Sequence, residues 1–164
     1  MFFPGFVWFV YCGKYYIFSV LYILRVECWG GSLSEGAVSR DVWEAADRVA
    51  AYLNVLLAID YDIDAIDRIA KARKLDDFME GIYNALRRRQ NLEESIIDAL
   101  ESERNEERCR ILNEALGMIR GLNPSHVEKL RGLSRGDVKL VASYIGSKAL
   151  AYTRTFGVLR QIFR

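Results

Sequence analysis

Apolar residues recur every three or four positions through most of the chain after residue 38, which is the spacing of one face of an α-helix. The first such run follows Ser39, whose side chain is suited to cap a helix, and Asp41 lies in its first turn. Its apolar positions are Val42, Ala46, Val49, Ala50, Leu53, Leu56 and Leu57. The pattern predicts a helix that begins next to Ser39 and presents one apolar face to a core.

The same periodicity continues in segments separated by polar breaks or by glycine and proline. These further helices are expected to begin at Asp62 or Asp64, at Asp76 or Asp77, after Asn91, at Ser125 and after Ser134. The helix after Asn91 is expected to be long, with a polar, solvent-facing middle at residues 101–110. Gly157 is expected to fray or bend the last helix. The sequence thus predicts an all-α fold, a compact bundle of five or six helices joined by short loops.

Residues 1–37 do not share this pattern and form an apolar N-terminal segment ahead of a helical domain at 38–164. Residues 1–26 nearly satisfy the requirement of about 20 mostly apolar residues for a membrane-spanning helix. Alternatively, residues 1 to about 32 are a gene-model extension translated from promoter DNA, since Trp29-Gly30-Gly31 can be encoded by a ribosome-binding sequence. A genuine buried hairpin is the third interpretation. Under the extension hypothesis, the body from Val38 onward folds without this segment.

Composition agrees with a folded domain, because 51% of the residues are apolar and 27% are charged. Cys12, Cys28 and Cys109 are scattered without a CxxC pair, which favours neither a metal site nor a disulfide framework. We therefore expect no cofactor or metal and a cytoplasmic location, where thiols stay reduced. Gln and Thr are scarce beside many charged residues, as in proteins from heat-adapted organisms.

The near-neutral net charge of +1 hides two opposed blocks. Residues 115–164 hold nine Lys or Arg against two acids, whereas residues 93–114 hold eight acids against three arginines. A basic segment that also contains Tyr and Phe is typical of a polyanion-binding surface, since cations displace counterions from phosphates and aromatic rings stack on bases. A solvated amphipathic helix with extra arginines is the alternative.

The residues predicted to bind nucleic acid are basic or aromatic. They are Arg135, Lys139, Tyr144, Lys148, Tyr152, Arg154 and Arg160, together with Arg87, Arg88 and Arg89. Tyr144, Lys148 and Tyr152 would form one stripe on the last helix at i, i+4 and i+8, unless one tyrosine belongs to the core. The three consecutive arginines have an alternative role at a helix end, where cations stabilise the helix dipole.

Motifs of enzymes are mostly missing from the sequence, which has no GxxxxGK[ST], GxGxxG or GxSxG segment. Arg120 and His126 are similar to the R-x4-6-H signature of helical HEPN ribonucleases, in which the histidine acts as acid or base on an RNA hydroxyl. Gly121 and Pro124 interrupt the helix that should carry this pair, so an ordinary residue in a helix first turn is the alternative for His126. We expect no catalytic residue.

The stretch from Val49 to Arg89 resembles the small subunit of the archaeal type I-A CRISPR surveillance complex, known as archaeal Cascade. It comprises a helix at 50–59, the element Ile66-Asp67-Arg68-Ile69-Ala70-Lys71-Ala72, and a second amphipathic helix at 78–87. The resemblance implies an antiviral-defence protein without an active site. Such a subunit would line the nucleoprotein filament and help hold guide RNA or the displaced DNA strand. Its partners would be single-stranded RNA or DNA, other effector subunits and further copies of itself. A membrane-anchored helical adaptor is a different hypothesis, which requires residues 1–26 to be genuine.

Overall fold

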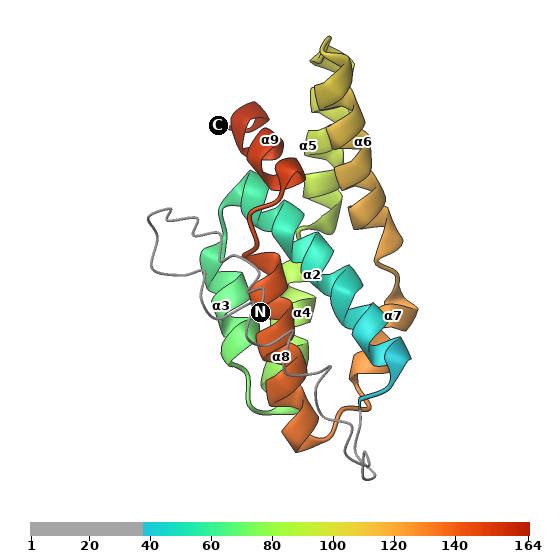
Figure 1. Cartoon of the computed structure of the whole chain (residues 1–164), viewed down its shortest axis with the longest axis vertical. Coiled ribbons are helices and arrows are strands. Elements are labelled where there is room, and N and C mark those ends of the chain that lie inside the picture. Colours follow the sequence, from blue (N-terminus) through green and yellow to red (C-terminus); the bar gives the residue numbers. More distant parts are fainter. Residues whose placement is uncertain (1–37) are drawn as a thin grey trace, which may run out of the picture. The chain divides into compact units, whose positions relative to one another are not determined.

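The computed structural model describes residues 38–164, and all regular structure in that range is α-helical, so the predicted all-α fold is confirmed. The apolar segment at 1–37, with its interpretations as an anchor or an extension, lies outside the described residues. The helices are α2 (Arg40–Asp60), α3 (Ile63–Lys71), α4 (Leu75–Leu86), α5 (Arg89–Ser102), α6 (Glu106–Gly121), α7 (Pro124–Leu130), α8 (Arg135–Ala149) and α9 (Arg154–Ile162) (Figure 1).

Three of the predicted helix starts are confirmed by side-chain capping. The side chains of Ser39, Asp62 and Ser134 accept hydrogen bonds from the backbone N–H groups at the starts of α2, α3 and α8. The predicted start after Asn91 is wrong, because α5 begins at Arg89, directly after a two-residue turn that ends α4. No side chain caps α5, so its start carries no local sequence signal.

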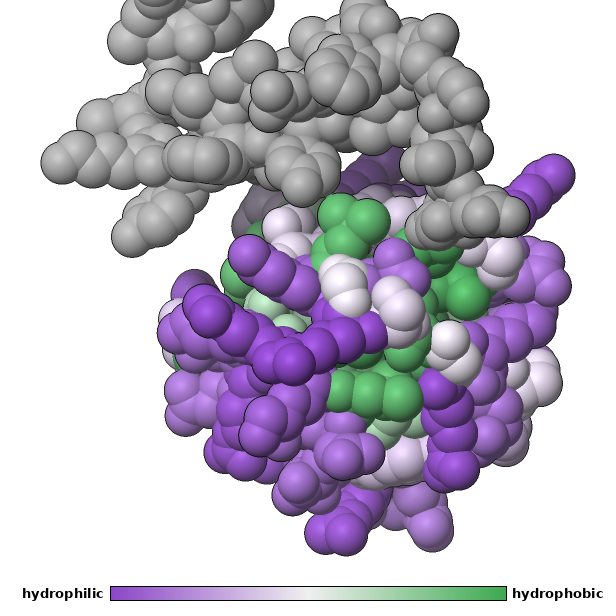
Figure 2. All heavy atoms as spheres, turned by 90° about the horizontal axis from the view of Figure 1, so that it is seen from below, coloured by the Kyte–Doolittle hydropathy of each residue, from purple (hydrophilic) through white to green (hydrophobic). Residues whose placement is uncertain are grey.

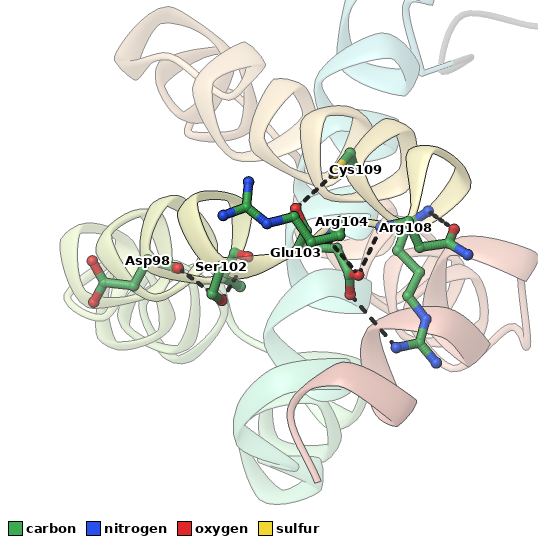
Figure 3. A network of polar contacts seen from close by, with 8 residues as sticks. Asp98, Ser102, Glu103, Arg104, Arg108 and Cys109 are labelled. Carbon is green, nitrogen blue, oxygen red and sulfur yellow. Dashed lines mark hydrogen bonds and ion pairs between the residues drawn. The ribbon is translucent and has the colours of Figure 1, made fainter.

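The predicted long helix after Asn91 is in fact two helices, α5 and α6, separated at Glu103 (Figure 3). The Glu103 carboxylate accepts hydrogen bonds from the backbone N–H groups of Arg104 and Asn105, both at 2.9 Å. The Asn105 side chain then caps α6 by accepting from the Arg108 N–H at 3.1 Å. These polar side chains bind the backbone and compete with a continuous helix. Part of the polar stretch at 101–110 is therefore a turn and not a solvated helix face.

Helix α2 lies at the centre of the bundle and packs against α6, α7, α8 and α9. Every residue from Tyr52 to Ala58 is buried, so this part of α2 has no solvent-facing side. Its polar atoms have partners, since the Tyr52 hydroxyl donates to the Ala85 carbonyl of α4 at 2.7 Å. Helices α6 to α9 therefore cover much of α2.

Helix α3 packs closely against both α4 and α8 at two glycines. A Cβ atom at Gly81 would lie 2.8 Å from Ile69 Cγ1, and a Cβ atom at Gly146 would overlap the Cβ of Ala70. Since Ile69 and Ala70 are neighbours in α3, the helix is held between two glycine positions that leave room for its backbone.

The predicted last helix is also divided, into α8 and α9, and the linker between them is fixed by a buried amide. Asn54 of α2 donates from Nδ2 to the carbonyls of Ala149 and Ala151, at 2.8 and 3.0 Å. These bonds turn the chain away from the axis of α8, and Thr153 then caps α9. The break therefore precedes Gly157, where a bend was expected, by several residues.

Figure 2 shows the end of the bundle where α8 begins, and there apolar side chains gather within a hydrophilic surround. Leu140 of α8 is one of the exposed large apolar residues in the described part. Within residues 38–164, no helix combines the length and apolar character needed to cross a bilayer.

We predict that Gly146→Ala lowers the free energy of unfolding by about 1–3 kcal/mol, because its new methyl group meets Ala70 in a packed crossing. Gly117→Ala is the matched control in an exposed helical position where nothing lies within 4 Å of the added Cβ. That variant should gain about 1 kcal/mol from helix propensity alone. Urea unfolding of the full chain measures both. Equal stabilisation by the two substitutions would contradict the close crossing of α3 and α8.

We also predict that Asn54→Ala destabilises the protein by about 2 kcal/mol, since it leaves the buried Ala149 carbonyl and the part-buried Ala151 carbonyl without this donor. Thr153→Ala, which loses only a 3.3 Å bond to Asn54 Oδ1 and the α9 cap, should cost about 1 kcal/mol. Urea midpoints give the comparison. If Asn54→Ala unfolds at the wild-type midpoint, the amide does not hold the linker.

Candidate nucleic-acid interface

The predicted stripe of Tyr144, Lys148 and Tyr152 on one helix does not exist, because α8 ends at Ala149. Tyr144 and Lys148 lie on α8, whereas Tyr152 lies in the linker. The ten predicted residues are distributed over four places in the fold. These are the start of α8 (Arg135, Lys139), an acid-centred cluster (Tyr144, Lys148), the α9 region (Tyr152, Arg154, Arg160) and the α4–α5 turn (Arg87, Arg88, Arg89).

Tyr144 and Lys148 both bind Asp47 of α2. The Tyr144 hydroxyl donates to Asp47 Oδ1 at 2.6 Å, and Lys148 Nζ donates to the same oxygen at 2.7 Å. The Lys148 ammonium also lies 5.0 Å from the centre of the Tyr144 ring. Tyr144 is half-buried and packs edge-to-face with Trp43, with ring centres 4.9 Å apart, so it is the tyrosine of the predicted stripe that joins the core.

The Asp47 cluster changes the proton affinity of its members. Burial opposes ionisation of Asp47, but the hydrogen bonds from Lys148 and Tyr144 outweigh it and lower the pKa of the carboxyl. Burial likewise opposes the charge on Lys148, and the bond to Asp47 outweighs it and raises the lysine pKa. Lys148 is thus a charged but already paired cation, with 52% of its side chain exposed.

Arg135 and Lys139 are the least engaged of the predicted cations. They lie four residues apart at the start of α8, on one helix face, and both are exposed. No acidic side chain among residues 38–164 forms an ion pair with either of them. Their charges are therefore available to an external anion.

The α9 region combines cations with exposed rings. Tyr152 is 69% exposed and packs edge-on against Phe156, with ring centres 5.6 Å apart. Its hydroxyl lies over Gly157, where a Cβ atom would come within 2.5 Å of the oxygen. Arg154 in the first turn of α9 pairs with Glu107 of α6 at 2.7 Å and stays 72% exposed.

Arg160 lies over the ring of Tyr61, with its guanidinium carbon 4.2 Å from the ring centre. Gly157 and Arg160 are three residues apart and share a face of α9. We call Tyr61, Tyr152, Phe156 and Arg160 the aromatic strip. Tyr61 was not among the predicted residues, because it lies outside both basic stretches of the sequence, residues 87–89 and 115–164. Its only signal in the sequence is a tyrosine between two aspartates at a predicted helix break.

Two of the three consecutive arginines are bound within the protein. Arg89 donates to the Leu122 carbonyl at 2.7 Å, where it neutralises the C-terminal end of α6. Arg88 bridges Asp60 and Asp62, at 3.4 and 3.1 Å. Arg87 is exposed. These contacts favour the alternative role of the three arginines, which is to stabilise helix ends within the fold.

Arg120 and His126 belong to different helices and to separate local contacts. Arg120 of α6 pairs with Glu93 of α5 at 2.6 Å. His126 completes a capping box at the start of α7, in which its Nδ1 accepts from the Asn123 N–H at 3.3 Å. The helix break expected from Gly121 and Pro124 is present.

A cavity of about 470 Å³ opens between the α5–α6 turn and the end of α9. Asp98 and Glu103 line it together with Arg108, so its charge is mixed and does not favour a polyanion. Backbone hydrogen bonds from Asn105 and Arg104 lower the Glu103 pKa and keep this acid ionised. Within residues 38–164, no three His, Cys, Asp or Glu side chains are grouped to hold a metal ion.

No protein-family model, curated protein or solved structure matches the chain. The functional argument therefore depends on the exposed cations of α8 and the aromatic strip.

We predict that Asp47→Asn lowers the free energy of unfolding at pH 7 by about 1 kcal/mol, the scale of a partly exposed ion pair. Because the folded protein lowers the Asp47 pKa, the stabilisation is present above the ordinary value of 3.8. It is lost as the pH falls through the folded-state pKa. Urea unfolding of the wild type and the variant should give different free energies of unfolding at pH 7. The two free energies should become equal at a pH below the folded-state pKa of Asp47. A difference that persists unchanged in acid would exclude ionised Asp47 as its source.

Proposed function

We propose that this protein is a non-enzymatic helical subunit that binds single-stranded nucleic acid through its C-terminal helices. The observation that carries the proposal is the aromatic strip, in which the exposed Tyr61 ring lies against Arg160 and the exposed Tyr152 ring packs against Phe156. Unpaired bases stack on exposed aromatic rings, and arginine adds charge and planar contact. A duplex, whose bases are already stacked, offers no such partner.

The exposed pair Arg135 and Lys139 supports the same proposal through the phosphates. Neither side chain has an acidic partner among the described residues, so a bound strand gains their full charge. Lys148 and Arg154 would contribute less, because each exchanges an existing carboxylate for a phosphate. Arg88 and Arg89 would contribute least, since both are bound within the fold.

The resemblance of residues 49–89 to the archaeal Cascade small subunit suggests the biological setting. In that setting the protein holds guide RNA or the displaced DNA strand, contacts other effector subunits and self-associates in the cytoplasm. The helices of the resemblance, α2 to α4, form the part of the bundle onto which α8 packs. The nucleic-acid surface would therefore be presented by the C-terminal helices on that base.

We predict that Arg135→Ala with Lys139→Ala weakens single-strand binding and reduces the slope of log K against log salt by about 1.4, or about 0.7 for each lost contact. Lys148→Ala with Arg154→Ala removes the same charge and is the matched comparison, and it should change the slope less. Fluorescence anisotropy of a labelled strand across a salt series measures both.

The wild-type protein should bind the single strand more tightly than its duplex and leave it intact on a denaturing gel. Equal slopes for the two double variants would assign binding to net charge alone. Strand cleavage by the wild type that His126→Ala abolishes would support the ribonuclease hypothesis instead.

A further inference from the structure

Tyr61 ends α2 in a backbone conformation that tyrosine rarely adopts. Its φ of 57° and ψ of 28° lie in the left-handed region. No other non-glycine residue in the described part of the chain has a positive φ. Glycine is the usual residue at such a helix end, because a Cβ atom crowds the backbone there. The helix end itself is closed by the Tyr61 N–H bond to the Leu57 carbonyl, which any residue except proline can make.

The tyrosine side chain is not required by the core either. It is 63% exposed, and its hydroxyl forms no hydrogen bond with another residue of 38–164. A large exposed ring at a position suited to glycine is strained without being required by the buried core. Strain of this kind is found at functional sites, where the side chain is retained for what it contacts.

Arg160 covers the ring at 4.2 Å, and no acid of the described residues forms an ion pair with this guanidinium. A ring held on one side by a cation keeps its orientation while most of its surface stays open to solvent. The neighbouring carboxylates of Asp60 and Asp62 are both paired with Arg88, which offsets their repulsion of a phosphate.

We infer that Tyr61, oriented by Arg160, is a stacking site for one unpaired base. Tyr152 of the α8–α9 linker, whose hydroxyl lies over Gly157 of α9, would then receive a neighbouring base. This inference rests on the proposed single-strand binding. It attributes part of the binding affinity to stacking on the bases and not to the phosphates. The Arg160 guanidinium is placed to meet the phosphate of the stacked nucleotide, since its charge has no described acidic partner.

Tyr61→Gly is a sharp test, because it removes the ring and relieves the left-handed backbone at once. The variant should melt close to the wild-type temperature, because relief of the left-handed backbone offsets the lost contact with Arg160. Its affinity for a single strand should fall by roughly 5- to 150-fold. The salt slope should stay unchanged, since no charge is lost. Tyr61→Phe, which keeps the ring, should bind within about twofold of wild type, as stacking requires no hydroxyl.

Ile63→Ala is the matched control, since Ile63 is a nearby apolar residue with 50% exposure and no ring. It should leave affinity within about twofold, because an aliphatic side chain offers no stacking face. If Tyr61→Gly proves unstable, Tyr61→Asn tests the same point with a residue that also tolerates positive φ.

The outcomes separate the two proposals. Wild-type affinity in Tyr61→Gly, with the wild type binding the strand, overturns the stacking site and leaves the proposed function standing. A loss of equal size in Ile63→Ala overturns it as well, because general apolar contact would then explain the effect. A wild-type protein that binds no single strand overturns both proposals.

Discussion

Burial of the middle of α2 on all sides is the constraint on which the other helices depend. The seven residues from Tyr52 to Ala58 have no exposed face, so each neighbouring helix must contribute an apolar surface to cover them. Asn54 lies within this stretch, and its amide has to find partners because an unpaired buried amide is costly. It finds them in the α8–α9 linker, which fixes where α9 starts. The position of the aromatic strip therefore follows from a polar group in the core.

Charge is separated along the sequence but not in space. The basic C-terminal block folds back on earlier helices, where Lys148 meets Asp47 and Arg154 meets Glu107. Pairs of this kind are partly exposed and contribute little stability each, yet they reduce the charge available to a polyanion. Other cations of this block, such as Arg135 and Lys139, form no ion pair with an acid of residues 38–164. Net charge of a segment is thus a poor measure of its surface potential.

The helical class, the apolar faces and several caps were predictable, because they depend on local spacing and on Ser39, Asp62 and Ser134. The two missed breaks differ in cause. The break at Glu103 has a local signal. Asn105 followed by Glu106 and Glu107 is typical of a helix start, but the apolar periodicity across residues 96–119 favoured one continuous helix in the prediction. The break after Ala149 depends on Asn54, which is 95 residues away in sequence, so no local pattern announces it. The strained backbone of Tyr61, on which its proposed role rests, was equally hidden, because backbone strain is a property of the folded chain.

The contact between Gly146 and Ala70 makes the residue tolerated at one position depend on the residue at the other. The combined volume of the two side chains at this crossing is fixed by the distance between the axes of α3 and α8. A methyl group gained at 146 is tolerable where one is lost at 70, and the reverse exchange restores the present pair. As this sequence diverges, substitutions at positions 70 and 146 should therefore occur together, so that one of the two helices keeps a glycine at the crossing.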